Sequence, residues 1–194
     1  MDPGQLPIVL LEGLISGLWL MFPAFVAGPG AVFCGGGPPI DGGRVGRDGQ
    51  RLLGDGKTWR GLLGGVAVAM AVGVAQQQAQ ARIGHPWLSD FGTAAYGVGF
   101  LYILFLLGLG SMLGDLAKSY AKRRLGKGRG TPLPLADQLD FLLGAWLLLL
   151  LGATSFAFSS IDGAQVLLLL LVTPAMHRVT NQVGFRMGRK KEPW

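Results

Sequence analysis

The sequence is poor in cysteine, histidine and charge. Its single cysteine, Cys34, excludes an intrachain disulfide and any zinc or iron–sulfur site built from several cysteines. Charged residues make up only 14% of the 194 residues, whereas hydrophobic residues make up 50%, a balance too apolar for an ordinary soluble domain. The composition therefore indicates a membrane protein and argues against redox chemistry.

The chain has instead a series of long apolar segments. Each approaches the roughly 20 residues that a helix needs to cross a bilayer. We expect an all-α integral membrane protein, a single membrane-embedded catalytic domain over residues 1–194, with long functional loops at 28–60 and 114–140. The five expected transmembrane helices cover about residues 6–27, 61–80, 91–113, 141–158 and 164–176.

The basic residues predict the orientation of these helices. Lysine and arginine gather in residues 44–60, 118–129 and 178–191, while Arg82 alone lies in the opposite set of loops. Because cytoplasmic loops carry an excess of lysine and arginine, we expect a multi-pass protein of the cell membrane. Its N-terminus would lie outside, and its C-terminus and both long loops would lie in the cytoplasm.

The first long loop combines glycine, proline and charge. Residues 28–56 are dense in glycine and proline, which argues against a helix and favours tight turns. The motif GDGKT at 54–58 ends like a phosphate-binding P-loop, but Arg51 stands where that motif requires glycine. A weaker interpretation survives, in which backbone N–H groups with Lys57, Thr58 and Arg60 hold a triphosphate; a plain basic membrane-surface loop is the alternative.

The second long loop brings acids and bases to the edge of an apolar segment. If the third segment continues as a helix, Asp115, Ser119 and Lys122 share one of its faces. Glycines and prolines after residue 125 then end this helix, and a new helix begins near Leu135. Asp137 and Asp140 would lie at its start, where one carboxylate is explained by the helix dipole but two on one face are less easily explained.

The same residues carry a family resemblance. The pattern G-D-L-x-x-S-x-x-K-R from Gly114 to Arg123, the linker, and D-x-x-D at 137–140 resemble the signature of CTP-dependent phosphatidate cytidylyltransferases. With GDGKTWRG at 54–61, HRVTNQ at 177–182 and the terminal PW, the chain more closely resembles their archaeal relatives, the CDP-archaeol synthases. Gln138, which stands where the bacterial and eukaryotic pattern has arginine, is one of the departures that favour the archaeal branch.

The resemblance implies a magnesium-dependent transfer between CTP and a lipid phosphate. The lipid would be an anionic ether lipid, a glycerol phosphate linked to two geranylgeranyl chains. Carboxylates suit Mg²⁺, which takes oxygen ligands, and we assign that ion to Asp115, Asp137 and Asp140, with Lys122 as the fourth catalytic residue. The predicted nucleotide- and phosphate-binding residues are Asp41, Asp55, Lys57, Thr58, Arg60, Ser119, Lys122 and Arg123.

Other functions remain open at this point. The acceptor could be phosphatidic acid, as in CDP-diacylglycerol synthases. A juxtamembrane basic cluster can also bind anionic headgroups without catalysis, in a scaffold or small transporter, although such a patch gains nothing from the interleaved aspartates. A CDP-alcohol phosphotransferase is disfavoured, because only the fragment DGGR at 41–44 fits its motif. We expect no nucleic-acid partner and no obligate protein partner.

Overall fold

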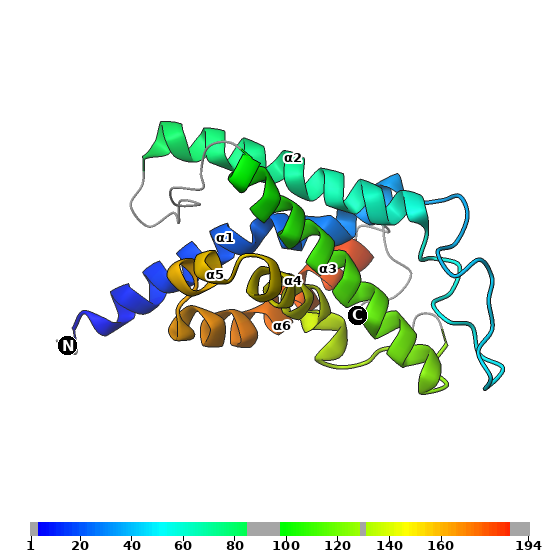
Figure 1. Ribbon diagram of the computed structural model, residues 1–194. Helices are drawn as coiled ribbons and strands as arrows, with labels where there is room; N and C mark the ends of the chain where they lie inside the picture. The colour runs from blue at the N-terminus through cyan, green and yellow to red at the C-terminus, as the bar shows by residue number, and fades with distance from the viewer. Residues whose placement is uncertain (1–3, 85–97, 129–130, 187–194) are drawn as a thin grey trace.

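The computed structural model describes residues 4–84, 98–128 and 131–186. The regular secondary structure of these residues is helical, as expected, and the longest stretch without a helix is the loop between α1 and α2 (Figure 1). The helices are α1 (Leu6–Cys34), α2 (Trp59–Ile83), α3 (Val98–Arg124), α4 (Ala136–Gly152), α5 (Thr154–Ser160) and α6 (Gly163–Arg186).

The expected five transmembrane helices are not all found. Within the described residues, three helices are long and apolar enough to cross a membrane: α1, α2 and α3 from Gly99. The pair formed by α5 and the first part of α6 would make a fourth span, but it is bent by 82°. The predicted segment 141–158 is therefore not one continuous helix, because the chain breaks at Ala153 between α4 and α5. The predicted start of the third span, residues 91–97, lies outside the described residues.

The first helix is longer than predicted. Residues 28–34, expected in a loop because of their glycines and proline, continue α1 as a helix. One of their glycines serves close packing instead: a Cβ at Gly30 would lie 2.7 Å from the Val68 Cβ of α2. Small residues let membrane helices approach closely, so the glycine-rich pattern here marks a helix contact and the loop begins only at Gly35.

The helices α3 and α4 pack backbone against backbone. A Cβ at Gly110 would lie 2.5 Å from the Gly144 carbonyl oxygen, and a Cβ at Gly114 would overlap the Asp140 carbonyl oxygen. This contact has the small-xxx-small spacing typical of close helix pairs in membranes. It brings Asp115, the next residue of α3, beside Asp140 of α4, so the packing of the two helices places the charged site.

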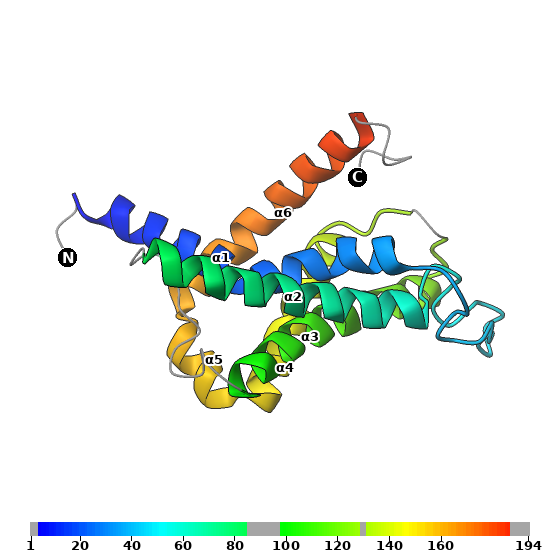
Figure 2. The ribbon, with the colours of Figure 1, turned by 90° about the horizontal axis from the view of Figure 1, so that it is seen from above.

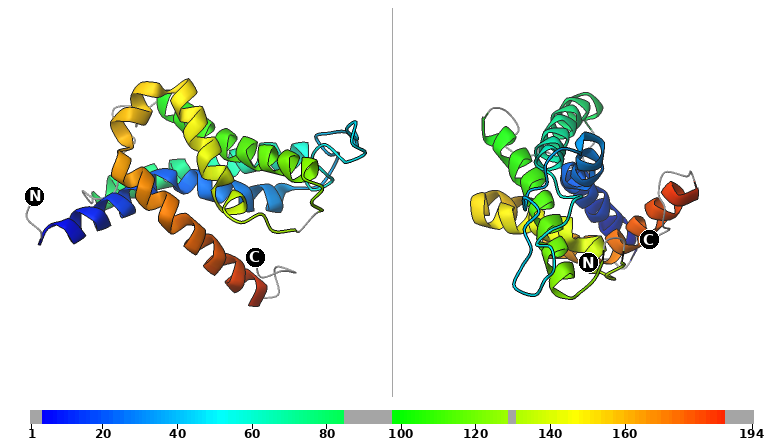
Figure 3. Two further views of the ribbon diagram at one scale, coloured as in Figure 1. Left: turned by 90° about the horizontal axis from the view of Figure 1, so that it is seen from below. Right: turned by 90° about the vertical axis from the view of Figure 1, so that its right-hand side faces the viewer.

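A core of apolar side chains fills the space between the helices. Its fully buried members include Met21 of α1, Leu104 and Leu107 of α3, Leu142 of α4 and Leu169 of α6. Towards its C-terminus, α6 turns away from the other helices (Figure 2). The loop between α1 and α2 and the end of α3 lie at one end of the molecule (Figure 3).

Candidate active site

Three carboxylates from two helices converge on one ammonium group. The Lys118 Nζ atom lies 3.1 Å from Asp115 Oδ1, 2.8 Å from Asp140 Oδ2 and 3.5 Å from Asp137 Oδ1. Asp140 is the most enclosed, with 7% of its side chain exposed. The structure thus brings together the three aspartates that the sequence predicts as a group.

Lysines from two further positions complete this charged cluster. Lys57, in the loop before α2, forms a short ion pair with Asp115. Lys122, one turn after Lys118 in α3, lies 2.6 Å from Asp137 Oδ1. Three carboxylates therefore face three ammonium groups, so the formal charge of the cluster is 3 − 3 = 0. We call these six residues the aspartate–lysine cluster.

The start of α4 is shaped around Asp137. The backbone N–H of Leu133 donates to Asp137 Oδ2 at 2.7 Å, and the Lys122 ammonium donates to the Thr131 carbonyl at 2.9 Å. Leu135, directly before the helix, has a φ of +64°, a conformation that non-glycine residues adopt at a cost of about 1 to 3 kcal/mol. The cluster thus ties the incoming chain to α3 and holds this turn in place.

The loop between α1 and α2 is organised by Asp41. Its side chain is 1% exposed and accepts hydrogen bonds from the backbone N–H groups of Leu53 and Gly54 at 3.0 and 3.1 Å. The Arg51 guanidinium lies 2.8 Å from Asp41 Oδ1, and it holds the pKa of the Asp41 carboxyl well below its usual range. Asp41 therefore builds the loop that carries GDGKT.

The ordered loop is attached to α3 by arginines. Arg124 lies 2.6 Å from Asp48 and donates to the Arg51 carbonyl at 2.8 Å. Arg123 lies beside Gly54 and lines a small cavity of about 170 Å³ with Arg51 and Asp55, among others. These contacts hold the loop against the end of α3, and they therefore fix the position from which the Lys57 side chain contacts the cluster.

The remaining predicted residues have varied surroundings. Thr58 is buried and caps α2, because its Oγ1 accepts the Gly61 N–H at 3.1 Å. Asp55 is 77% exposed and pairs with Arg51 at 2.6 Å. Ser119 is buried in α3, whereas Arg60 is exposed and packs over Gly37. These four residues lie around the aspartate–lysine cluster rather than in it, and their nucleotide contacts stay predictions.

Lys118 is the site residue that the sequence analysis missed. As one of the basic residues in 118–129 it indicates only the orientation of the chain, although its position three residues after Asp115 places both on one helix face. In the described segments, no three Asp, Glu, His or Cys side chains are arranged to hold a metal ion as they stand. The magnesium assignment stays a prediction.

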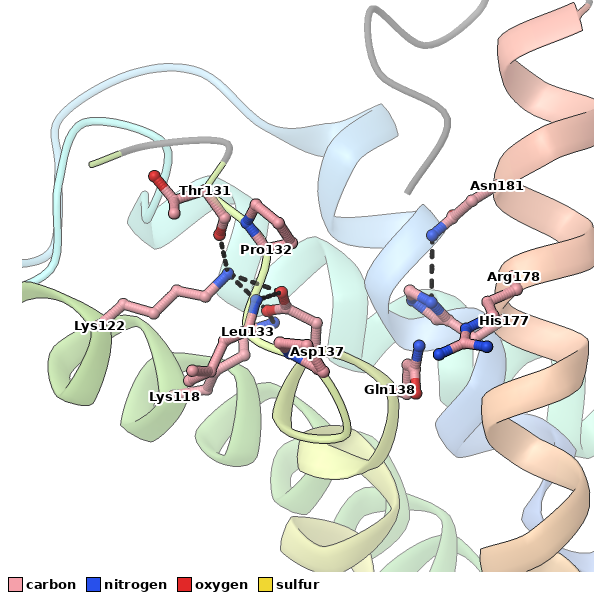
Figure 4. A pocket seen from close by; sticks show the side chains of 11 residues that line it. Lys118, Lys122, Thr131, Pro132, Leu133, Asp137, Gln138, His177, Arg178 and Asn181 are labelled. Carbon is pink, nitrogen blue, oxygen red and sulfur yellow. Dashed lines mark hydrogen bonds and ion pairs between the residues drawn. The ribbon is translucent and has the colours of Figure 1, made fainter. Parts of the chain in front are cut away.

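A larger cavity adjoins the cluster on the Asp137 side. It has a volume of about 340 Å³ and lies between α3, the segment 131–134, the start of α4 and the last turns of α6 (Figure 4). Lys118, Lys122 and Asp137 line it from the cluster side, and Arg178 is among the residues that line it from α6. The cavity is large enough for a small anionic group with its attached carbon chain.

Comparison with known proteins gives consistent results. Residues 10–194 match the family model described as CarS-like, CDP-archaeol synthase. The chain is 42% identical over 174 residues to a CDP-archaeol synthase of Methanosphaerula palustris, covering 90% of this chain and 100% of that protein. It is 40% identical over 184 residues to one of Thermococcus onnurineus, covering 95% and 99% of the two chains.

A solved structure is similar as well. It is described as an intramembrane enzyme for archaeal membrane lipids biosynthesis, and it is 38% identical to this chain with a TM-score of 0.61. The match covers 84% of this chain and 94% of the other. The chain therefore belongs to the CarS-like family of CDP-archaeol synthases.

Proposed function

We propose that this protein is a CTP-dependent cytidylyltransferase that acts on an ether-lipid phosphate, 2,3-bis-O-geranylgeranylglyceryl phosphate, at the membrane surface. Membership of the CDP-archaeol synthase family supports the reaction. One observation supports the site: aspartates and lysines from α3, α4 and the GDGKT loop meet in the aspartate–lysine cluster.

The reaction asks for placement and charge neutralisation. A phosphate oxygen of the lipid attacks the α-phosphorus of CTP, a new P–O bond forms, and the bond to the β-phosphate breaks with release of pyrophosphate. A phosphomonoester is largely dianionic near neutral pH, since its second pKa is about 6, so it needs little help from a base. Electrostatics and in-line positioning therefore dominate.

The lysines of the cluster suit this task. Lys57 would bind the triphosphate, because it belongs to the GDGKT motif and contacts Asp115 of the cluster. Lys122 would lie towards the lipid phosphate, because it lines the larger cavity. In the structure each of these two lysines pairs with an aspartate. On binding, the substrate phosphates would replace the aspartates as partners of the two ammonium groups.

The three carboxylates are also the type of ligand that Mg²⁺ takes, although they are arranged around the Lys118 ammonium group. Three carboxylates lie within 3.5 Å of one cationic atom, Lys118 Nζ, and Mg²⁺ is bound by carboxylates together with substrate phosphates. The cluster itself is neutral, so a bound cation would help to balance the charge of a triphosphate. Asp115, Asp137 and Asp140 would hold it, with Lys118 displaced towards the phosphates. When bound, the ion would neutralise charge on the α-phosphate and the leaving pyrophosphate.

The same reasoning favours a cytoplasmic site. CTP is a cytosolic nucleotide, and the loop between α1 and α2 lies at the same end of the molecule as the end of α3 (Figure 3). Lys57 of this loop contacts the cluster, and Arg124 of α3 contacts Asp48 of the loop. With lysine and arginine in excess on the cytoplasmic side, the N-terminus of α1 would lie outside.

Product analysis tests this proposal. The purified protein would be incubated with α-³²P-labelled CTP, Mg²⁺ and either the digeranylgeranyl lipid phosphate or phosphatidic acid. A labelled CDP-lipid is expected with the ether lipid, with pyrophosphate in equal amount. Product from phosphatidic acid alone would identify a CDP-diacylglycerol synthase, and no product from either lipid would refute the activity.

A further inference from the structure

The larger cavity has a wall that the proposed nucleotide site does not use. This wall is the face of α6 that carries His177, Arg178 and Asn181 (Figure 4). His177 Nδ1 and Asn181 Nδ2 lie 3.0 Å apart, so the imidazole ring is held in one orientation. The wall faces Gln138 of α4 across the cavity.

Gln138 is the feature that points to a ligand. Only 8% of this residue is exposed, and its Oε1 atom is buried without a hydrogen-bond partner among the described residues. Leaving such a group unsatisfied costs about 1 to 3 kcal/mol, and unsatisfied buried groups in native proteins need an explanation. The terminal amide can turn either its oxygen or its NH₂ group towards a bound molecule. A polar ligand in the cavity would satisfy it.

Arg178 indicates that the ligand is negatively charged. Its side chain is exposed, and within the described residues no carboxylate lies within the 4.0 Å of an ion pair, in contrast to Lys118 and Lys122 across the cavity. The planar guanidinium presents parallel N–H donors that match a phosphate. The cavity therefore favours an anion that has at least two oxygen atoms to accept hydrogen bonds from Arg178.

The position of the cavity distinguishes between the two phosphate substrates. Lys57 reaches the cluster through Asp115, whereas the cavity reaches it through Asp137, and no residue of the GDGKT loop lines the cavity. In an in-line transfer the attacking and leaving oxygens lie on opposite sides of the phosphorus. If the triphosphate lies on the Lys57 side, the attacking phosphate has to come from the Asp137 side.

We propose that this cavity binds the phosphate of the acceptor lipid, with Arg178 and Gln138 as specific binding residues. The lipid chains would enter the bilayer between α4 and α6, where α6 turns away from the other helices (Figure 2). The inference rests on the proposed function and deepens it, because it assigns the two phosphate substrates to separate sides of the aspartate–lysine cluster.

Steady-state kinetics with both substrates varied test the assignment. The variant Arg178→Ala should raise KM for the digeranylgeranyl lipid phosphate by at least about tenfold, which corresponds to about 1.4 kcal/mol. Its KM for CTP, its kcat at saturating lipid and the Ki of pyrophosphate should stay unchanged. Arg178→Lys should recover part of the loss. The matched control is Arg186→Ala, an exposed arginine further along α6 that does not line the cavity, and it should behave as wild type.

A second variant protects the test against misfolding. Gln138→Leu keeps the side-chain size and removes the buried amide, so it should remain folded and raise the lipid KM in the same direction. Unchanged lipid KM in both variants would overturn the assignment, as would a rise in KM for CTP or in the Ki of pyrophosphate instead. Failure of the proposed function looks different, because the wild-type protein would then form no CDP-lipid at all.

Discussion

Replacing Gly114 with alanine should separate α3 from α4 and disturb the site without touching a charged residue. The added Cβ would overlap the Asp140 carbonyl oxygen, and it would lie 2.8 Å from the Asp140 carbonyl carbon and 3.3 Å from the Gly144 Cα. All three neighbours are backbone atoms, which cannot turn aside as a flexible side chain can. The helices would have to part.

The size of the effect follows from these contacts. Non-bonded carbon atoms prefer about 3.5 to 4.0 Å, so relieving the contact with the Asp140 carbonyl carbon requires a shift of roughly 1 Å. Overpacking of this kind destabilises by about 1 to 3 kcal/mol, against a gain of about 0.5 to 1 kcal/mol for alanine over glycine within a helix. We expect a net loss of up to about 2.5 kcal/mol. The same shift moves Asp115 from Asp140, and a misplacement of about 1 Å can reduce a rate roughly a hundredfold.

The measurements are thermal denaturation in detergent and the initial rate of CDP-lipid formation. Gly28→Ala in α1 is the matched control, because a Cβ there meets nothing within 4 Å and should leave both quantities at or slightly above wild type. A Gly114→Ala protein as stable and active as Gly28→Ala would refute the argument that backbone packing positions the aspartates.

Three further predictions concern the loop and its orientation. Lys57→Ala should raise KM for CTP with little change in KM for the lipid; the reverse pattern would assign the GDGKT loop to the lipid headgroup. Because the pKa of Asp41 is lowered in the folded protein, its stabilising effect is complete above the ordinary value of about 3.9 and is lost as pH falls through the folded value. Acid denaturation followed by circular dichroism should therefore show less pH dependence in Asp41→Asn, and an unchanged profile would contradict this role. In a background without Cys34, single cysteines at Gln50 and Gly128 should react with an impermeant thiol reagent only after the cytoplasmic face is opened, and labelling in intact cells would separate the site from cytosolic CTP.

The candidate site was largely predictable because its residues obey local rules. Asp115 and Lys122 share a face once α3 continues as a helix to Arg124, and α4 begins at Ala136 as the prolines before it suggest. The two acidic residues at the start of α4 are therefore expected to contact the basic residues at the end of α3. The structure brings the three aspartates together around Lys118, whereas their role as site residues and their binding of magnesium stay predictions.

The predictions from the sequence were wrong where one residue type occurs in two kinds of structure. Glycines in residues 28–34 suggested turns, yet Gly30 lets α1 approach α2, and only the partner helix reveals this. The break at Ala153 lies in an apolar stretch whose composition does not distinguish one bent segment from one straight helix. Lys118 was overlooked because basic residues beside a membrane are common, and its place among three carboxylates depends on how α4 packs.

The aspartates of the cluster are proposed to be essential for the cytidylyl transfer because they hold Mg²⁺. The variant Asp140→Asn tests this proposal most directly. The amide is nearly isosteric, so the melting temperature and the close packing of α3 and α4 should be kept. With CTP, lipid phosphate and Mg²⁺ saturating, we predict a single-turnover rate at least a hundredfold lower, about 2.7 kcal/mol, and Asp137→Asn should behave alike. A near-normal rate with unchanged magnesium dependence would contradict the account and leave these carboxylates with only a structural role at the start of α4.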